Sequence, residues 1–283
     1  MHPELFKIGP VTVYSYGLML GVSFVVAFLV FESQLKRMGI DPGVGRIVTL
    51  LAIVFGAVGA KLLYVIENFD LFLRAPRILF SPGRLTWYGG FVLAAAAIWA
   101  YCRRRKIRFA HVCDAAAPAL LLGYGVARIG CHLAGDGDYG IPTDLPWAAV
   151  YANGTYPPSL AFGGFPEIVR KYGVNGVVPD TIPVHPTPIY ELLIGLLGFV
   201  VFIRLAKKAR PAGWLFMAYL LFAGSARFLV EFLRLNRRVL LGLSDAQMVS
   251  ALMMVAGIVG LWMLSGSPKS ARPPAPGQAG GRA

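Results

Sequence analysis

Seven runs of apolar residues, each long enough to cross a lipid bilayer as a helix, constrain this chain more than any other feature. A helix rises about 1.5 Å per residue and the hydrocarbon core is about 30 Å thick, so roughly 20 apolar residues span it. The runs cover approximately Tyr16 to Gln34, Ile47 to Ile66, Trp87 to Cys102, Val112 to Leu133, Pro188 to Leu205, Gly213 to Phe232 and Ala246 to Leu264. We therefore predict an all-α polytopic membrane protein of about seven transmembrane helices.

Composition agrees with this prediction, because 57% of the residues are hydrophobic and only 14% are charged. A soluble chain of this length needs polar surface to cover its core, whereas a chain in a lipid bilayer can face lipid with apolar side chains. The formal net charge is +13, but the basic residues gather in short clusters between the apolar runs. Such clusters are topology signals, so they do not indicate a nucleic-acid partner.

The basic clusters also predict the orientation of the helices. They follow the odd-numbered runs and comprise Lys36, Arg37 and Arg46, the sequence RRRKIR, Arg204 with KKAR, and Lys269 with Arg272. With seven spans these clusters share one face, and positively charged loops favour the cytoplasm. We expect the N-terminus outside and the C-terminus in the cytoplasm.

Two segments lack the pattern of a membrane span. Residues 134–185 are polar and rich in Gly and Pro, so we expect a small extracytoplasmic cap inserted into a transmembrane domain of residues 1–265. The cap either acts as a lid over a site or lies on the membrane surface as an amphipathic segment. Its aromatic residues include Trp147, Tyr151, Tyr156 and Phe165. Residues 266–283 are of low complexity and are expected to be a disordered cytoplasmic tail.

Ionisable side chains near the ends of the apolar runs are the strongest functional signal, because a charge in hydrocarbon is costly and usually faces a partner or water. Arg128 and His132 are four residues apart in the fourth run and therefore share one helical face. Asp136 and Asp138 follow in a glycine-rich turn. We expect these groups to lie together at the extracytoplasmic end of the run.

The sixth run carries a second basic residue, Arg227, four residues before Glu231, so the two can pair along one face. The same spacing is typical of a purely structural ion bridge between helices. Arg234 lies a further turn outward and is expected at the membrane interface. A guanidinium offers several donors that match phosphate oxygens, so Arg128 and Arg227 together predict a site for an anionic phospholipid.

Two further segments supply candidate binding residues. In VHPTPIYELLIG, His185 precedes the fifth run, and Tyr190 and Glu191 enter it. In TWYGGF, the pair Gly89 and Gly90 allows close approach of a backbone or a ligand.

The sequence predicts no metal site and no cofactor. The cysteines, Cys102, Cys113 and Cys131, form no metal-type pair, and the histidines, His2, His111, His132 and His185, lack ligand spacing.

Six motifs, in this order, resemble the prolipoprotein diacylglyceryl transferases of bacteria. They are IGPVTVYSYGLMLG, YGGF, ARIGCHLAGDGDYG, HPTPIYELLIG, RFLVEFLR and LSDAQMVS, and the resemblance runs from Phe6 to about Leu264. It implies a multi-pass inner-membrane enzyme with its site on the extracytoplasmic side. The family transfers a diacylglyceryl group from phosphatidylglycerol to the lipobox cysteine thiol of a prelipoprotein, forming a thioether and releasing glycerol 1-phosphate.

The resemblance also assigns roles to individual residues. Matches to the family's motif residues are Tyr16, Arg128, Gly140, Arg227 and Glu231, and Asp136 stands where the family usually has glutamate. Two positions depart from the pattern. Tyr88 replaces the histidine before Gly89 and Gly90, and Cys131 replaces an asparagine and is followed by His132.

The predicted mechanism needs a thiolate and a stabilised phosphate leaving group. Arg128 and Arg227 are expected to bind the phosphate, and Glu231 to orient Arg227. His132 is the first candidate for the base and Tyr88 the second, since a phenol is rarely ionised at neutral pH. The full predicted set for phosphatidylglycerol is Arg128, Arg227, Tyr16, Gly89, Gly90, Asp136, Gly140, His185, Tyr190 and Glu191.

Two other functions fit intramembrane charges. One is a transporter, although no inverted repeat is evident and the charged groups collect at one face. The other is a catalytically inactive relative that binds phospholipid.

Overall fold

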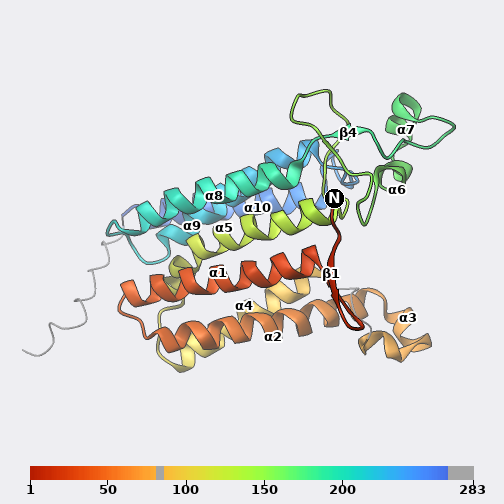
Figure 1. Cartoon of the computed structure of the whole chain (residues 1–283). Coiled ribbons are helices and arrows are strands. Elements are labelled where there is room, and N and C mark those ends of the chain that lie inside the picture. The colour runs from red at the N-terminus through yellow and green to blue at the C-terminus, as the bar shows by residue number, and fades with distance from the viewer. Residues whose placement is uncertain (81–85, 267–283) are drawn as a thin grey trace, which may run out of the picture. The chain divides into compact units, whose positions relative to one another are not determined.

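The computed structural model describes residues 1–80 and 86–266, and 68% of these residues are helical. Long helices form at each predicted position (Figure 1): α1 (Ser15–Arg37), α2 (Pro42–Glu67), α4 (Trp87–Arg104), α5 (Phe109–Ala134), α8 (Thr187–Ala206), α9 (Trp214–Val230) and α10 (Asp245–Leu264). The prediction of an all-α polytopic fold is confirmed. Residues 267–283 of the predicted tail lie outside the described residues.

Among the described residues, six helices are long and apolar enough to cross a membrane, namely α1, α2, α5, α8, α10 and α9 with the three residues after it. The helix α4 does not meet that standard, because its 18 residues end on Arg103 and Arg104. A helix thus forms where the third span is predicted, but the count of seven spans stays a prediction.

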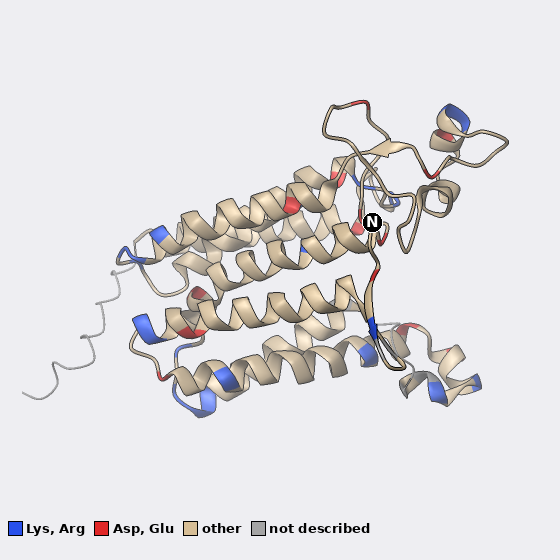
Figure 2. Cartoon of the chain, viewed as in Figure 1, with Lys and Arg blue, Asp and Glu red and all other residues tan. Residues whose placement is uncertain are grey.

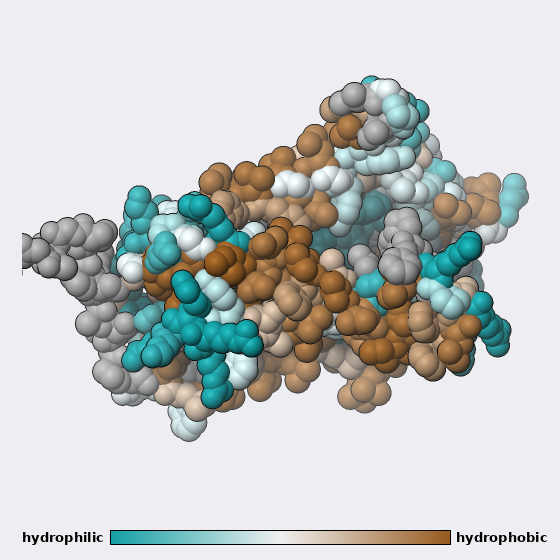
Figure 3. All heavy atoms as spheres, turned by 90° about the horizontal axis from the view of Figure 1, so that it is seen from below, coloured by the Kyte–Doolittle hydropathy of each residue, from teal (hydrophilic) through white to brown (hydrophobic). Residues whose placement is uncertain are grey.

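The surfaces of these helices are those of a membrane protein. Large apolar side chains such as Leu50, Leu197 and Leu252 are exposed along α2, α8 and α10. Figure 3 shows hydrophobic residues over the middle of one helical surface and hydrophilic residues toward its ends. Exposed apolar surface of this extent is unfavourable in water and favourable against lipid tails. The protein is therefore a multi-pass membrane protein.

The chain divides into two compact units. Among the described residues, the first comprises 1–30 and 116–266, and the second comprises 31–80 and 86–115. In the second unit, α2 and α4 pack through glycines, since a Cβ atom on Gly89 would lie 2.3 Å from the carbonyl oxygen of Gly59. A Cβ atom on Gly90 would lie 2.6 Å from the carbonyl oxygen of Gly56. The short helices α3 (Phe69–Arg74) and η1 (Pro76–Phe80) follow α2.

The first unit contains the helices that carry most of the predicted site. An antiparallel hairpin of β1 (Glu4–Ile8) and β2 (Val11–Tyr14) leads into α1. The helices α9 and α10 pack closely, because Gly224 and Gly257 let each backbone approach the other helix. The single turn η3 (Glu231–Leu233) ends α9.

Residues 134–185 fold as a small lobe with its own core. Its elements are β3 (Ala149–Val150), α6 (Pro158–Ala161), η2 (Phe162–Gly164), α7 (Pro166–Tyr172) and β4 (Pro183–Val184), and β3 pairs with β4. Tyr139, Tyr151 and Phe162 are buried at its centre. Tyr151 therefore belongs to the lobe's core, whereas Trp147 and Tyr156 are exposed.

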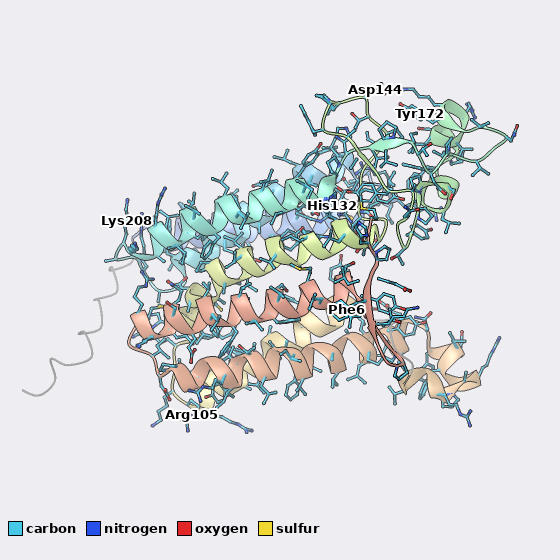
Figure 4. The ribbon with its side chains drawn as sticks, viewed as in Figure 1. Phe6, Arg105, His132, Asp144, Tyr172 and Lys208 are labelled. Carbon is cyan, nitrogen blue, oxygen red and sulfur yellow. The ribbon has the colours of Figure 1, made fainter. Side chains whose placement is uncertain are left out.

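The basic connection between α8 and α9 and the lobe lie at opposite ends of the first unit. Lysines and arginines gather at the connection from α8 to α9, and the lobe lies beyond the other end of α8 (Figure 2). Figure 4 places His132 at the lobe end of α5 and Lys208 at the far end of α8.

Candidate active site

Three arginines and three carboxylates of the first unit form one ion-pair network, which we call the arginine–carboxylate cluster. Its members are Arg128 on α5, Asp138 in the turn that follows, Glu191 on α8, Arg227 on α9, Glu231 at the start of η3, and Arg234 just after it. Charged groups from α5, the turn after it, α8 and the region of α9 and η3 therefore meet at a single place.

Two glycines bring α5 and α8 into contact. A Cβ atom on Gly195 would lie 2.9 Å from the carbonyl oxygen of Leu121 and 3.0 Å from the Cα atom of Gly125. Since neither glycine has a side chain, the two backbones approach closely. Glu191, about one turn before Gly195, thereby reaches Arg128.

Glu191 is the centre of the cluster. One of its carboxylate oxygens lies 3.1 Å from Nε of Arg128 and accepts a hydrogen bond from Nη1 of Arg234 at 3.2 Å. The other oxygen accepts from the hydroxyl of Tyr124 at 2.5 Å and from Nη1 of Arg227 at 3.5 Å. A single carboxylate thus contacts all three arginines.

Asp138 is shared by two of the same arginines. Arg128 donates to one oxygen of this carboxylate, and Arg234 donates to the other. Burial alone would raise the pKa of Asp138, but the two guanidinium groups outweigh burial and hold the pKa below its ordinary value. Asp138 is therefore ionised at neutral pH.

Glu231 fixes Arg227 and joins α9 to α10. Its carboxylate is fully buried and lies 2.7 Å from Nη2 of Arg227. It also accepts hydrogen bonds from Ser244 at 2.5 Å and from Asn236 at 2.7 Å. Ser244 is the N-cap of α10 and forms a capping box with Gln247. The pair of Arg227 and Glu231 is therefore both a helix-to-helix link and a means of orienting a guanidinium.

Exposure differs among the arginines, although all are largely buried. The side chain of Arg234 is 7% exposed, that of Arg128 is 14% and that of Arg227 is 23%. Three guanidinium groups and three carboxylates balance in formal charge. The cluster is thus neutral overall, and Arg128 and Arg227 are its more accessible cations.

A pocket of about 760 Å³ lies beside the cluster. Its lining is His132, Leu145, Trp147, Ala149, His185, Pro186, Ile189, Tyr190, Leu193 and Leu233. The lobe and the start of α8 both contribute to this lining. Tyr190 and Leu193 flank Glu191 in the sequence, so one segment serves both the pocket and the cluster.

The polar side chains of this pocket contact one another in histidine–tyrosine pairs. Nδ1 of His132 lies 2.8 Å from the hydroxyl of Tyr151. The indole of Trp147 donates to the hydroxyl of Tyr190 at 2.8 Å, and that hydroxyl lies 3.2 Å from Nδ1 of His185. Burial lowers the pKa of His185, which favours its neutral form.

Tyr16 and Gly140, both predicted from the sequence, support the geometry of the cluster. A Cβ atom on Gly130 would lie 3.2 Å from the Cα atom of Tyr16, so the start of α1 packs against α5 close to Arg128. A Cβ atom on Gly140 would lie 2.3 Å from the carbonyl oxygen of Leu233. Only glycine at position 140 lets this turn approach η3.

Tyr88, Gly89 and Gly90 lie in the first turn of α4, in the second unit. The two glycines account for the close packing of α2 and α4 described above. Their contact with phosphatidylglycerol, inferred from the resemblance, stays a prediction.

Asp136 and Asp138 have different surroundings. Asp136 accepts the backbone N–H of Asp138 at 3.2 Å, whereas Asp138 contacts the arginines. Burial first and the nearby Asp138 second raise the pKa of Asp136. Cys131, Asp136 and Asp138 offer ligand atoms within 4.8 Å of one another, close enough for a metal ion. Arg128 and Arg234 already neutralise Asp138, which weakens its attraction for a cation.

Three members of the site were not assigned a role from the sequence. Arg234 was expected at the membrane interface, but it is buried, because η3 turns the chain back toward Glu191. Asp138 and Tyr124 were absent from the predicted set. For Tyr124 a signal existed: it precedes Arg128 by four residues, so it shares the same helical face.

The fold and the cluster define a class, an α-helical multi-pass membrane protein with buried arginines paired to carboxylates from several segments. A family model described as prolipoprotein diacylglyceryl transferase matches residues 3–263. The chain belongs to this family.

Relatives from several bacteria support the assignment, and each is named phosphatidylglycerol–prolipoprotein diacylglyceryl transferase. The relative from Dehalococcoides mccartyi is 33% identical over 90% of this chain and 91% of its own length. The relative from Clostridium tetani is 28% identical over 91% of this chain and 96% of its own length. The relative from Proteus mirabilis is 30% identical over 91% of this chain and 90% of its own length.

Proposed function

We propose that this protein transfers a diacylglyceryl group from phosphatidylglycerol to a cysteine thiol in the lipobox of a prelipoprotein. The thiol loses its proton, and its sulfur bonds to the diacylglyceryl carbon that carries the phosphate oxygen. The bond from that carbon to the oxygen breaks, so the products are a thioether and glycerol 1-phosphate. Family membership and the names of the relatives support this function.

One observation carries the proposal: guanidinium groups from two different helices reach the same carboxylate. Arg128 on α5 and Arg227 on α9 both contact Glu191, so they lie close enough to act on one phosphate. In this role they bind the headgroup and offset the charge that develops on the departing oxygen. Glu231 holds Arg227 in place from the other side.

Deprotonation of the thiol is assigned to His132 first and Tyr88 second. His132 lines the pocket beside the cluster, and its Nδ1 contacts Tyr151, which fixes the ring. An imidazole held in this way is suited to accept a proton near neutral pH. Tyr88 is the alternative because it occupies the position of the family's histidine.

The remaining predicted residues complete a binding site for phosphatidylglycerol. Tyr16 packs against α5 close to Arg128, and Asp136 and Gly140 lie in the segment that follows α5. Gly89 and Gly90 are assigned by the resemblance. His185 and Tyr190 line the pocket, whose apolar walls suit a hydrophobic substrate segment.

We place the enzyme in the bacterial inner membrane, with residues 1–265 as the catalytic domain and 134–185 as an extracytoplasmic cap. The hydrogen bond from exposed Trp147 of the cap to Tyr190 of α8 supports a role for the cap as a lid over the lipobox peptide. The other role predicted for the cap, contact with the membrane surface, is favoured by the same exposed aromatic groups.

Reconstituted vesicles test the function directly. Protein in vesicles with radiolabelled phosphatidylglycerol should transfer label to a lipobox peptide, but not to the same peptide with serine in place of cysteine. Arg227→Ala should lower transfer by about a hundred-fold or more, as expected when a donor to the departing oxygen is lost. Normal transfer by Arg227→Ala would remove the proposed role of this arginine.

The same vesicles separate the other two functions. A catalytically inactive relative binds phosphatidylglycerol without forming a thioether, and a transporter gives solute flux without labelling the peptide.

A further inference from the structure

We infer that Arg234 is a positioning residue that keeps Glu191 and Asp138 neutralised while Arg128 turns to the phosphate of a bound lipid. The inference deepens the proposed function and rests on it for the identity of that lipid. Arg234 itself does not touch the phosphate in this scheme. Its action on the substrate runs through Arg128.

The two arginines hold the same two carboxylates. Arg128 bridges Asp138 and Glu191, and Arg234 bridges the opposite oxygen of Asp138 and the same oxygen of Glu191. The four side chains form a closed ring of alternating charge. Each carboxylate in this ring keeps one cation when the other cation leaves.

Burial decides which cation leaves. The side chain of Arg234 is 7% exposed, half the exposure of Arg128 at 14%. Arg128 also has replaceable partners, the hydroxyl of Tyr124 at 3.0 Å and the sulfur of Cys131 at 3.6 Å. A phosphate oxygen can substitute for such neutral groups and gains a charge-assisted hydrogen bond. Arg234 is thus the fixed counterion and Arg128 the exchangeable one.

Charge balance explains why a second bridging arginine is needed. A buried carboxylate without a cation is strongly unfavourable, so Glu191 and Asp138 would otherwise retain Arg128. Without Arg234, three carboxylates face two guanidinium groups, and the cluster carries a net negative charge that repels phosphate. Loss of Arg234 therefore opposes lipid binding in two ways.

Two variants that break the ion pair of Arg234 and Asp138 are predicted to have opposite effects on the affinity for phosphatidylglycerol. Arg234→Gln leaves the cluster negative, and Asp138→Asn leaves it positive. We expect Arg234→Gln to bind phosphatidylglycerol about ten-fold more weakly than the wild type, and Asp138→Asn to bind it at least as tightly. A purely structural ion pair predicts that both variants weaken binding, and that outcome would overturn the inference.

Binding is measured on full-length protein in nanodiscs of phosphatidylcholine, titrated with fluorescent phosphatidylglycerol, with zwitterionic phosphatidylcholine of the same fluorophore as control. Thermal unfolding of each variant identifies loss of fold. If Arg234→Gln does not fold, Arg234→Lys takes its place: one ammonium keeps the charge but bridges two carboxylates poorly. Intermediate weakening supports the inference, and binding equal to the wild type opposes it.

The double variant Arg234→Gln/Asp138→Asn restores neutrality and frees Arg128 from one carboxylate. Its affinity should recover to within about three-fold of the wild type, and no recovery would refute the exchange. In transfer assays, Arg234→Gln should raise KM for phosphatidylglycerol more than it lowers kcat. A wild type that binds the lipid without transferring it would refute the proposed function and leave the binding comparison intact.

Discussion

At the scale of single residues, the buried carboxylates determine what the arginines can do. Glu191 contacts three guanidinium groups. Glu231 pairs with Arg227 and accepts a hydrogen bond from Ser244, the N-cap residue of α10. A carboxylate with this many donors is difficult to replace, because each orphaned donor would keep a desolvation cost of about 1–3 kcal/mol. The orientation of Arg227 is therefore set by two buried carboxylates, those of Glu191 and Glu231.

The identity of the base gives a prediction at this scale. If His132 takes the thiol proton, His132→Gln should reduce transfer by about a hundred-fold or more, and Tyr88→Phe should have a small effect. The reverse ranking would assign the role to Tyr88. The measurement is the initial rate of thioether formation across a range of pH, at saturating phosphatidylglycerol. Unchanged rates in both variants would exclude both residues as the base.

Sequence reasoning identified most of the cluster at this scale. Helical spacing paired Arg227 with Glu231, because side chains four residues apart share a face. The same spacing placed His132 on the face of Arg128, but His132 contacts Tyr151 and is not a member of the cluster. It did not find the roles of Arg234 and Asp138, since both lie in irregular segments whose course depends on tertiary contacts. The helical periodicity of the sequence does not predict the direction of the chain after a turn such as η3.

At the scale of elements, glycine spacing positions the site. Gly195 and Gly125 let α5 and α8 touch, and this contact brings Glu191 to Arg128. The sequence predicted the extent of these helices well, because long apolar runs leave few alternatives in a membrane. It could not predict which helices pair, since many glycines occur in the spans and only some face a neighbouring backbone.

The helix contact gives a prediction with a matched control. Gly195→Ala places a Cβ atom 2.9 Å from the carbonyl oxygen of Leu121, so α5 and α8 must separate. We expect a loss of about 1–3 kcal/mol in stability and reduced transfer. Gly21→Ala, on α1, meets nothing within 4 Å and should be neutral. Thermal unfolding in detergent compares the two, and equal stability of both variants would contradict the packing argument.

At the scale of the whole molecule, the distribution of basic residues along the chain predicts how the protein is oriented in the membrane. The basic connection from α8 to α9 and the lobe lie at opposite ends of the first unit (Figure 2). Positive residues near spans remain in the cytoplasm, which favours a lobe outside. The lobe's fold was beyond sequence reasoning, because its core depends on contacts such as the stacking of Tyr139 on Tyr151.

A topology reporter tests this orientation. Alkaline phosphatase, which is active only outside the cytoplasm, should be active when inserted near Asn153 in the lobe and inactive when fused after Ala283. A fluorescent protein that matures only in the cytoplasm should give the opposite pattern. Phosphatase activity at the C-terminal fusion would reverse the predicted topology.

The network around Glu191 also bears on selectivity. Its arginines are already saturated by tethered anions, so a soluble phosphate ion has to displace a competitor held at high local concentration. A phospholipid has an additional source of affinity, because its tails reach apolar surroundings that the free ion cannot use. Under the proposed function, inorganic phosphate should therefore be a poor inhibitor of transfer, even in a phosphate-rich medium.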